Sequence, residues 1–576
     1  MKSIVSVLCL AAAPLFAADL QPLWPEGKIP NCQEHQIAAP WEEVRKPGFD
    51  RAAHRMPYLE WSAKPAKPNG ACMILISGGG YWATVDGPMF RPLEQQLLSN
   101  GVTCVWLWYR TPQPKGLAQH QSAWEDGQRA VRLVRAAAKE RGFDPEKIGV
   151  LGCSAGSHLS VLLATSSQTP AYTNKVDAID ELPCHINWAV PMCVAFVLSD
   201  GPNRQNEQDG DGEFLTLDPA LKFDAKTCPM CFLHGGADFF SPNGSTRLYR
   251  KLREMKIPAE VHIDPDRGHG PVDPKKFERA IEFMRQMGYL EPLQPEVDLM
   301  TRFTADGRRA YEKQPVWPEG KMPNADTNQC TPELVWSFPK KLTTKAIQII
   351  YSGGSYMGNS TYGHEVAPAR CYLNDKGMTV VTLTYRTPNK DRARKHLAPW
   401  QDLQRTIRLV RSQAAEKGLD PNRIGIMGSS AGGHLTLMGA TSSRHHAYYT
   451  YPEDPIDKIP CNVQWAVAIY PAYALTDGID WHNTTGGNAD SARLVPEFSF
   501  DRDTCPILFI HGDADGWAAM NSVKCWEQLK RMGIQGELHT LCRRNHCFQF
   551  KASPGTGSYT WLDRIWDFMT VKGFNK

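Results

Sequence analysis

Short apolar runs recur in the same order in the two halves of this 576-residue chain. Most are apolar throughout, which is typical of strands buried on both faces of a parallel sheet. Between them lie segments with helical spacing, such as Ala130, Leu133, Val134 and Ala137 at positions i, i+3, i+4 and i+7. The alternation predicts an α/β fold with a mostly parallel sheet covered by helices on both faces. The predicted strands are 73–76, 103–109, 148–151, 186–192, 230–233 and 260–263, then 347–350, 380–385, 424–427, 463–469, 507–510 and 537–540.

The repeat divides the chain into two domains of similar size. A loop rich in proline and glycine at residues 23–31 returns at residues 316–324. From this loop the first half takes more residues than the second to reach the next strand, so we expect the mouths of the two domains to differ in shape. The predicted division is 1–18, a signal peptide; 19–292, the first α/β domain; 293–315, a linker without a periodic pattern; and 316–576, the second α/β domain.

The first residues resemble a secretory signal. Lys2 precedes an apolar stretch from Ile4 to Phe16 that ends in the small residues Ala17 and Ala18. The alternative is a short core helix, since the stretch is too short to span a bilayer. We expect export to the periplasm or the medium.

Composition limits the partners and leaves the cysteines open. The chain is 42% hydrophobic and 22% charged, with a net charge of +3. This charge favours neither a nucleic acid nor a membrane surface as partner, and it leaves the oligomeric state undetermined. Of the 16 cysteines, two pairs precede predicted neighbouring strands and are disulfide candidates, the alternative being half-buried thiols. The pairs are Cys184 with Cys228 and Cys461 with Cys505.

A G-x-S-x-G motif stands between a predicted strand and a predicted helix in each half. The motifs are Gly152 to Gly156 and Gly428 to Gly432. In this position the serine lies on a sharp turn, and its hydroxyl is lifted above the end of the sheet. A chance match is the alternative for one copy, but two copies in the same context favour a nucleophile elbow. The predicted nucleophiles are Ser154 and Ser430.

A glycine-rich loop follows the first predicted strand of each half, at residues 77–81 and 352–356. Neither copy fits a nucleotide-binding pattern. Two hypotheses remain: each loop is only a tight turn, or its N–H groups lie opposite the elbow and stabilise a developing oxyanion. The predicted oxyanion donors are Gly79, Gly80 and Ala155 in the first half and Gly354, Ser355 and Ala431 in the second.

A serine nucleophile needs a base, and the base needs a carboxylate to hold it. The expected order along the chain is serine, acid, histidine. Asp238 and Asp515 follow a predicted strand, and Asp513 competes with Asp515 but has no acidic counterpart. His269 and His546 follow the last predicted strand, each 31 residues after the acid. These four residues complete the two predicted triads.

Other polar residues are assigned structural roles. We expect His234 and His511 to be structural and Asp126 and Asp402 to serve helix N-termini. One pair of histidines and one pair of aspartates suggest a metal site. Neither pair recurs in the other half, so no metal site is predicted. These pairs are His445 with His446 and Asp264 with Asp266.

Three motifs resemble α/β-hydrolase esterases of the acetyl-xylan and feruloyl esterase type. They are residues 128–135, 142–145 and 152–158, with counterparts at 404–411, 418–421 and 428–434 that are still more similar. The resemblance implies hydrolysis of O-acyl esters on oligo- or polysaccharides, without a cofactor. It does not identify the acyl group, and O-acetyl esters of sialylated glycans are another possibility.

Several positions depart from that pattern. Ser77 and Ser352 replace a leading histidine, Ser355 replaces the third glycine, and Ser157 replaces a glycine after the elbow. A serine peptidase of the prolyl-oligopeptidase type shares the fold, but no propeller-like strand array precedes either domain. The remaining alternative is that one half is a decayed hydrolase that binds carbohydrate. Ser355 and Trp517 make the second half the candidate for this.

Overall fold

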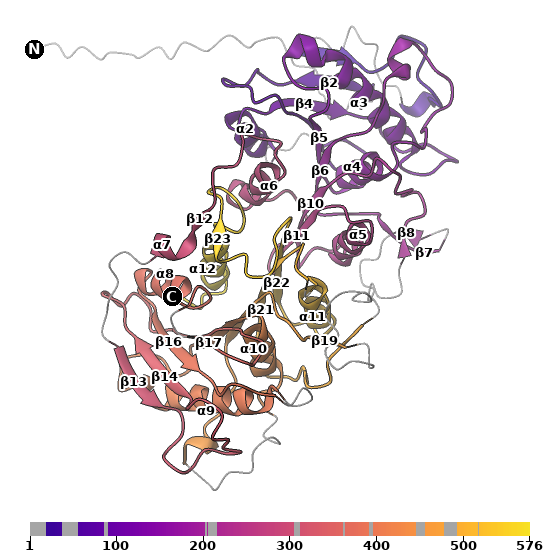
Figure 1. The fold of residues 1–576 in the computed structure, drawn as a ribbon. Helices are drawn as coiled ribbons and strands as arrows, with labels where there is room; N and C mark the ends of the chain where they lie inside the picture. Colours follow the sequence, from indigo (N-terminus) through magenta and orange to yellow (C-terminus); the bar gives the residue numbers. More distant parts are fainter. Residues whose placement is uncertain are drawn as a thin grey trace, which may run out of the picture.

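The computed structural model describes residues 19–36, 56–85, 90–201, 204–205, 216–303, 311–360, 363–390, 395–444, 455–476, 492–516 and 518–576. In this part of the chain the two halves share one 16-stranded sheet (Figure 1). The first half contributes β1 (Asp19–Pro22), β2 (Tyr58–Trp61), β3 (Cys72–Ile76), β4 (Thr103–Trp108), β5 (Ile148–Cys153), β6 (Trp188–Met192), β10 (Met230–Gly235) and β11 (Ala259–Asp264). The second contributes β13 (Tyr311–Pro315), β14 (Glu333–Ser337), β15 (Ile347–Tyr351), β16 (Thr379–Thr384), β17 (Ile424–Ser429), β18 (Trp465–Ile469), β21 (Ile507–Gly512) and β22 (Gly536–Leu541).

All twelve predicted strands are present, and within each half they form a parallel sheet. The sheet runs in the order β1-β2-β4-β3-β5-β6-β10-β11-β22-β21-β18-β17-β15-β16-β14-β13. The antiparallel outer pairs β1–β2 and β13–β14 were not predicted. The predicted fold class, two tandem α/β-hydrolase domains, is confirmed, with the addition that their sheets are continuous.

Helices cover both faces of the sheet (Figure 1). On one face the helices pack on residues such as Ile74 and Ile349, and on the other on residues such as Leu75 and Ile350. This division follows from the alternation of side chains along a strand. The first face carries α3 (Gln121–Arg141), α4 (Ala155–Thr165), α5 (Asn243–Glu254), α9 (Leu397–Ala414), α10 (Ala431–Thr441) and α11 (Met520–Arg531), and the second carries α2 (Arg91–Ser99), α6 (Pro274–Gln286), α8 (Ala367–Asp375) and α12 (Trp561–Val571).

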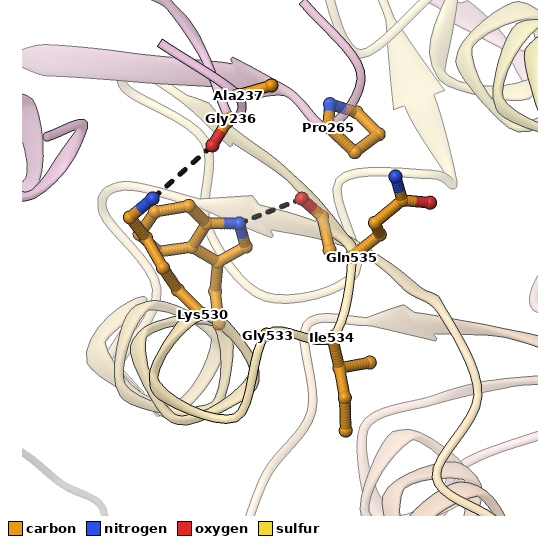
Figure 2. A pocket seen from close by; sticks show the side chains of 9 residues that line it. Gly236, Ala237, Pro265, Lys530, Gly533, Ile534 and Gln535 are labelled. Carbon is orange, nitrogen blue, oxygen red and sulfur yellow. Dashed lines mark hydrogen bonds between the residues drawn. The ribbon is translucent and has the colours of Figure 1, made fainter. Parts of the chain in front are cut away.

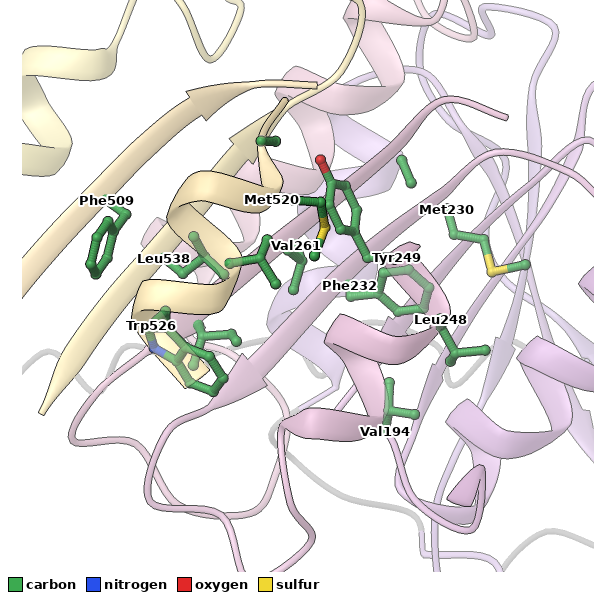
Figure 3. Close-up of a cluster of buried hydrophobic side chains, with 14 of the residues drawn as sticks. Val194, Met230, Phe232, Leu248, Tyr249, Val261, Phe509, Met520, Trp526 and Leu538 are labelled. Carbon is green, nitrogen blue, oxygen red and sulfur yellow. The ribbon is translucent and has the colours of Figure 1, made fainter. Parts of the chain in front are cut away.

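The two halves meet at β11 and β22, which pair antiparallel at the centre of the sheet. His262 lies opposite His539 and Ile263 opposite Leu538. Beside this seam α5 and α11 add Tyr249 and Trp526 to one hydrophobic core that contains residues of both halves (Figure 3). The domains therefore form one folded body.

The predicted linker contains regular structure. In it β12 (Val297–Asp298) pairs with β23 (Lys551–Ala552), and α7 (Leu299–Phe303) follows. Residues 311–315, which the sequence places in the linker, form β13 at the outer edge of the second half. The remaining short elements are η1 (Glu34–Gln36), η3 (Ala178–Glu181), η4 (Pro455–Lys458), β7 (Leu198–Gly201), β8 (Arg204–Gln205), β9 (Thr216–Leu217), β19 (Leu475–Thr476) and β20 (Arg493–Leu494).

The two predicted disulfides are wrong for this structure, because all four cysteines are free thiols. Cys184 Sγ donates to the carbonyl of Ser167 at 3.2 Å, and Cys461 Sγ donates to that of Ser443 at 3.2 Å. Each thiol is thus turned towards the end of the elbow helix of its own half. Among the described residues, no helix is both long and apolar enough to cross a membrane.

Candidate active site

The two elbows have nearly the same backbone conformation. Ser154 has φ 58° and ψ −124°, and Ser430 has φ 56° and ψ −120°. A positive φ is strained for a serine and marks a sharp turn held by its surroundings. A Cβ atom on Gly152 would lie 2.1 Å from the carbonyl oxygen of Gly156, and one on Gly428 would lie 2.4 Å from that of Gly432. The flanking residues must therefore be glycines.

In the second half the predicted nucleophile, base and acid form a continuous hydrogen-bonded chain. Asp515 lies in the loop after β21 and His546 in the loop after β22. His546 Nε2 is 2.8 Å from Ser430 Oγ, and His546 Nδ1 is 2.7 Å from Asp515 Oδ2. A histidine in this position is within reach of the serine proton while the carboxylate fixes its orientation.

In the first half only two of the three residues are joined. His269 Nδ1 lies 2.9 Å from both carboxylate oxygens of Asp238. The structure records no hydrogen bond between His269 and Ser154, although it describes both residues. The His269 ring instead packs against both Phe239 and Phe240, at centroid distances of 4.5 and 5.2 Å. The sequence spacing, which is nearly the same in both halves, did not reveal this difference.

Both acids have a second buried histidine partner. His234 Nε2 lies 3.3 Å from Asp238 Oδ2, and His511 Nε2 lies 3.1 Å from Asp515 Oδ2. Burial raises the pKa of both carboxyls, but the hydrogen bonds and charges of their two histidines outweigh it and hold the pKa well below its usual value. His234 and His511 are buried, and each contacts the acid of its half, which the sequence did not indicate.

The glycine-rich loops lie directly against the nucleophiles. A Cβ atom on Gly78 would be 2.8 Å from Ser154 Cβ, and one on Gly353 would be 2.7 Å from Ser430 Cβ. The predicted oxyanion residues in these loops all have positive φ. The φ angles are 129° for Gly79, 62° for Gly80, 101° for Gly354 and 55° for Ser355, so Ser355 keeps the backbone conformation of the glycine that it replaces.

The other two predicted oxyanion residues, Ala155 and Ala431, are the first residues of α4 and α10. A backbone N–H at this position has no acceptor inside its own helix. Tyr81 OH bonds His158 Nδ1 at 2.8 Å, and Tyr356 OH bonds His434 Nδ1 at 2.8 Å. Each tyrosine ties the glycine-rich loop to the elbow helix of its half.

Glu365 is a candidate functional residue that the sequence did not single out. Its carboxylate accepts the N–H of Gly353 at 2.6 Å and the hydroxyl of Tyr470 at 3.3 Å, and the ring of Tyr470 packs 4.6 Å from that of His546. Burial raises the pKa of Glu365, and nearby groups, including His546, oppose the shift. Cys193 occupies the position of Tyr470 in the first half, and its Sγ contacts the backbone of Gly270 beside His269.

The prediction that Asp126 and Asp402 serve helix N-termini is wrong. Asp126 lies inside α3, where it accepts from Arg110 at 3.0 Å and from Trp24 Nε1 at 2.8 Å. In α9, Asp402 makes the same bonds to Arg386 and Trp317. An aspartate, an arginine and a tryptophan recur at matching positions in both halves. This recurrence was the sequence signal that could have predicted their contact.

Two groups of described residues bring three possible metal ligands within 4.8 Å of one another: Cys193, Asp238 and His269, and Cys231, Glu260 and His262. Each group already contains a hydrogen-bonded histidine and carboxylate pair. Asp264 binds Arg279 and Asp266 binds Lys572, which accounts for the acidic pair noted in the sequence. His445, His446 and Trp517 lie outside the described residues.

The family follows from a comparison of the chain with known proteins. A profile of the BD-FAE family matches residues 61–202 and 337–528, which together make up more than half of the chain. The chain belongs to the BD-FAE family. Both matched segments contain an elbow serine and a glycine-rich loop, so the profile matches part of each half. The predicted resemblance to α/β-hydrolase carbohydrate esterases is confirmed.

Curated relatives match parts of this BD-FAE protein. An acetylxylan esterase of Xylanibacter ruminicola is 35% identical over 111 residues, which cover 19% of this chain and 22% of the relative. Esterase LipQ of Mycobacterium tuberculosis is 26% identical over 33% of this chain and 47% of its own. Endo-1,4-beta-xylanase B of Butyrivibrio fibrisolvens is 26% identical over 34% and 32%. The chain thus spans less than half of the length of each of these relatives.

Two solved structures of hydrolases are similar to part of the BD-FAE protein. An acetyl ester-xyloside bifunctional hydrolase from Caldicellulosiruptor lactoaceticus has 25% sequence identity and a TM-score of 0.37, over 46% of this chain and 97% of its own. Esterase 2 of Thermogutta terrifontis, phosphoramylated by tabun, has 21% identity and a TM-score of 0.36, over 48% and 98%.

Proposed function

We propose that this BD-FAE protein is a carboxylic ester hydrolase that uses serine, histidine and aspartate to remove acyl groups from polysaccharides. The observation that carries the proposal is the chain Ser430–His546–Asp515, with contacts of 2.8 and 2.7 Å at the end of the shared sheet. Acyl transfer by a serine requires a strained elbow, a buried acid and an adjacent glycine-rich loop, and the second half has all three.

The proposed reaction begins at Ser430 Oγ, which attacks the carbonyl carbon of the ester while its proton passes to His546 Nε2. Asp515 holds the imidazole by Nδ1 and stabilises the positive charge that forms there. The N–H of Ala431, with those of Gly354 and Ser355, stabilises the tetrahedral oxyanion, and losing one such donor costs about 3–4 kcal/mol. His546 then donates the proton to the departing sugar oxygen. A water molecule, deprotonated by the same histidine, attacks the acyl-serine; the bond to Ser430 Oγ breaks, the carboxylic acid leaves, and His546 returns the proton to Ser430 Oγ.

The substrate class is proposed from the relatives. One relative is named an acetylxylan esterase and another a xylanase. We infer that the natural substrate is an acetylated xylan or a related acylated polysaccharide, with feruloyl esters as a second group. Such a substrate is found outside the cell, in agreement with the proposed signal peptide in residues 1–18.

A second candidate function applies to the first half alone, and not to the second half that Ser355 and Trp517 had suggested. We propose that the first half holds the polysaccharide more than it hydrolyses it. His269 has no hydrogen bond to Ser154 in the described structure, while two aromatic side chains at this site are open to solvent. Trp82, two residues after Gly80, is 66% exposed, and Phe239, next to Asp238, is 49% exposed. Exposed aromatic side chains beside a site are typical of surfaces that contact a ligand.

Acetate release from acetylated xylan tests both proposals. We expect the wild-type chain to release acetate and a chain with Ser154→Ala and Ser430→Ala together to release none above background. Release by the double variant at the wild-type rate would show that neither serine is the nucleophile. Ser154→Ala is expected to keep most of the hydrolysis and Ser430→Ala most of the xylan binding, measured by co-sedimentation with the insoluble polymer.

A further inference from the structure

Each candidate acid lies in a loop that is contacted by a helix of the other half. The acids follow β10 and β21, which flank the central strands β11 and β22. The helices α5 and α11 pack beside the same seam (Figure 1). Both helices end near the acid loop across the seam, because the two halves are related by an approximate two-fold arrangement.

The second acid loop is bound by two residues of the first half. Arg253, in the last turn of α5, donates Nη1 to the main-chain carbonyl of Asp513 and to Asp513 Oδ1, the latter at 2.6 Å. Tyr249, one turn earlier, donates its hydroxyl to the same Oδ1 at 2.8 Å. Asp513 is the residue that competed with Asp515 for the role of acid, and it stands two positions before it.

The first acid loop has a weaker form of the same contact. Lys530, in the last turn of α11, donates Nζ to the carbonyl of Gly236 at 3.3 Å (Figure 2). Gly236 stands two positions before Asp238, but has no carboxylate to offer. Lys530 instead lines a cavity of about 180 Å³ with Trp526, Ile534 and Pro265. Burial lowers the pKa of Lys530, and the charge of Asp238 opposes this shift. The lysine therefore interacts electrostatically with the acid of the other half.

The loops transmit such a contact to the histidine as well as to the acid. In the second half, Asp513 N bonds the carbonyl of Leu541 at 2.8 Å, and Ala514 N bonds that of Arg544 at 2.9 Å. Arg544 stands two residues before His546. The peptide that Arg253 binds is therefore hydrogen-bonded to the segment that carries the base, and a shift of this peptide changes the spacing between Asp515 and His546.

We propose that each half supplies positioning residues to the active site of the other: Arg253 and Tyr249 to the site of Ser430, and Lys530 to the site of Ser154. The inference rests on the proposed function and extends it, because each acid loop accepts a hydrogen bond from a helix of the other half. The stronger contact belongs to the second site, which also has the complete hydrogen-bonded chain. Positioning matters because small displacements of catalytic groups lower rates strongly.

The same pair of helices provides a matched control. Arg250 of α5 forms an ion pair with Glu527 of α11, and Thr246 Oγ1 donates to the same carboxylate at 3.0 Å. This contact also crosses the seam but touches neither acid loop. Arg250→Met therefore weakens the contact between the two halves without touching an acid loop. Arg253→Met weakens that contact and also removes the hydrogen bonds to the acid loop of the second half.

The test uses the full chain with Ser154→Ala, so that only Ser430 reacts, and an acetyl ester as substrate. We expect Arg253→Met to lower kcat about tenfold or more with KM nearly unchanged. Tyr249→Phe is expected to have a smaller effect, Arg253→Lys to restore part of the rate, and Arg250→Met to leave it within about twofold. In a chain with Ser430→Ala, where only Ser154 reacts, only Lys530→Met is expected to slow hydrolysis.

Tyr249→Phe removes a single hydroxyl, so it replaces Arg253→Met in the test if that variant does not fold.

A second readout does not depend on turnover. We expect the proton between His546 Nδ1 and Asp515 to give a downfield NMR resonance, which Arg253→Met should shift or broaden and Arg250→Met should not. Folded Arg253→Met and Tyr249→Phe variants with unchanged kcat and resonance would overturn the inference. Absence of ester hydrolysis in every chain, with a resonance that still responds to Arg253→Met, would overturn the proposed function but support the positioning role.

Discussion

The two candidate sites share a backbone but differ around the histidine. The elbow serines agree within 4° in φ and ψ, and both histidines bond their acids. Only His546 also bonds its serine. In the second half Tyr470 and Glu365 pack beside the histidine and the glycine-rich loop, whereas in the first half Cys193, Phe239 and Phe240 surround it. The comparison teaches that side chains next to the triad, rather than the triad residues, distinguish the two sites.

The largest expected difference between the sites is in turnover. Removing a serine nucleophile lowers kcat at its own site by about 10⁴-fold or more. We therefore expect Ser430→Ala to leave at least about tenfold less acetyl esterase activity than Ser154→Ala. The measurement is kcat of both purified variants on one acetyl ester. Equal losses would mean that the two sites are equally competent and would break the comparison.

The next difference concerns the buried arginine that follows β4 in the first half and β16 in the second. Arg386 pairs with Asp402 and the neutral Gln401, whereas Arg110 pairs with two carboxylates, those of Glu125 and Asp126. All of these ionic side chains are buried. Arg386→Met should lower the free energy of unfolding by about 3–5 kcal/mol, since it leaves one buried carboxylate unpaired. Arg110→Met leaves two and should cost more. Denaturant unfolding compares them, and a smaller loss for Arg110→Met would contradict the assignment.

At the seam the two halves are alike, and there the prediction concerns pH. Glu260, His262, His539 and Glu537 form a buried row with contacts of 2.9, 2.9 and 2.6 Å. Three hydrogen bonds need three protons, and two neutral imidazoles supply only two, so one carboxyl supplies the third. In agreement, burial raises the pKa of Glu260 and of Glu537 to about 8 and lowers the pKa of both histidines.

The sign of the effect follows from proton binding. Between about pH 6.5, where free histidine titrates, and pH 8, the folded protein keeps a carboxyl proton that the unfolded chain releases. The free energy of unfolding should therefore fall by about 2 kcal/mol as the pH rises through this window. Below it, uptake of protons by the unfolded histidines offsets the trend. Replacing Glu260 and Glu537 by glutamine should flatten the slope, and an unchanged slope would contradict the proton count.

The smallest expected effect should be equal in the two halves. Trp24 Nε1 donates to Asp126 at 2.8 Å, and Trp317 Nε1 donates to Asp402 at 2.7 Å. Trp24→Phe and Trp317→Phe each remove one hydrogen bond to a buried carboxylate, which should cost about 1–3 kcal/mol. Thermal unfolding of both variants checks this. Clearly unequal shifts in Tm would show that the two loops have different structural roles.

The sequence predicted the central strands well and the edges poorly. Strands such as β5 and β17 are buried on both faces, so an uninterrupted apolar run marks them. The outer strands β1 and β13 are partly exposed and polar, and nothing in their pattern separates them from a loop. The roles of Asp126 and Asp402 were misjudged because their partners, Arg110 and Arg386, come before them in sequence and meet them only in the folded sheet.

The order and spacing of the residues along the chain were sufficient to predict that each acid lies next to its histidine. They did not show whether the histidine reaches the serine. That contact depends on packing by residues such as Phe239 and Tyr470, which the motifs do not include. The contacts of Arg253 and Lys530 were also beyond the sequence, because they depend on how two similar domains pair through β11 and β22. Patterns within one domain carry no information on that pairing.

The most direct test of the central claim, that the second half holds the competent nucleophile, is the rate at which a fluorophosphonate labels each serine of the wild-type chain. Digestion and mass spectrometry at successive times report the labelled fraction of the two elbow peptides separately. The account predicts that Ser430 is labelled much faster than Ser154, and that Arg253→Met slows labelling of Ser430. Labelling of Ser154 at an equal or higher rate would contradict it.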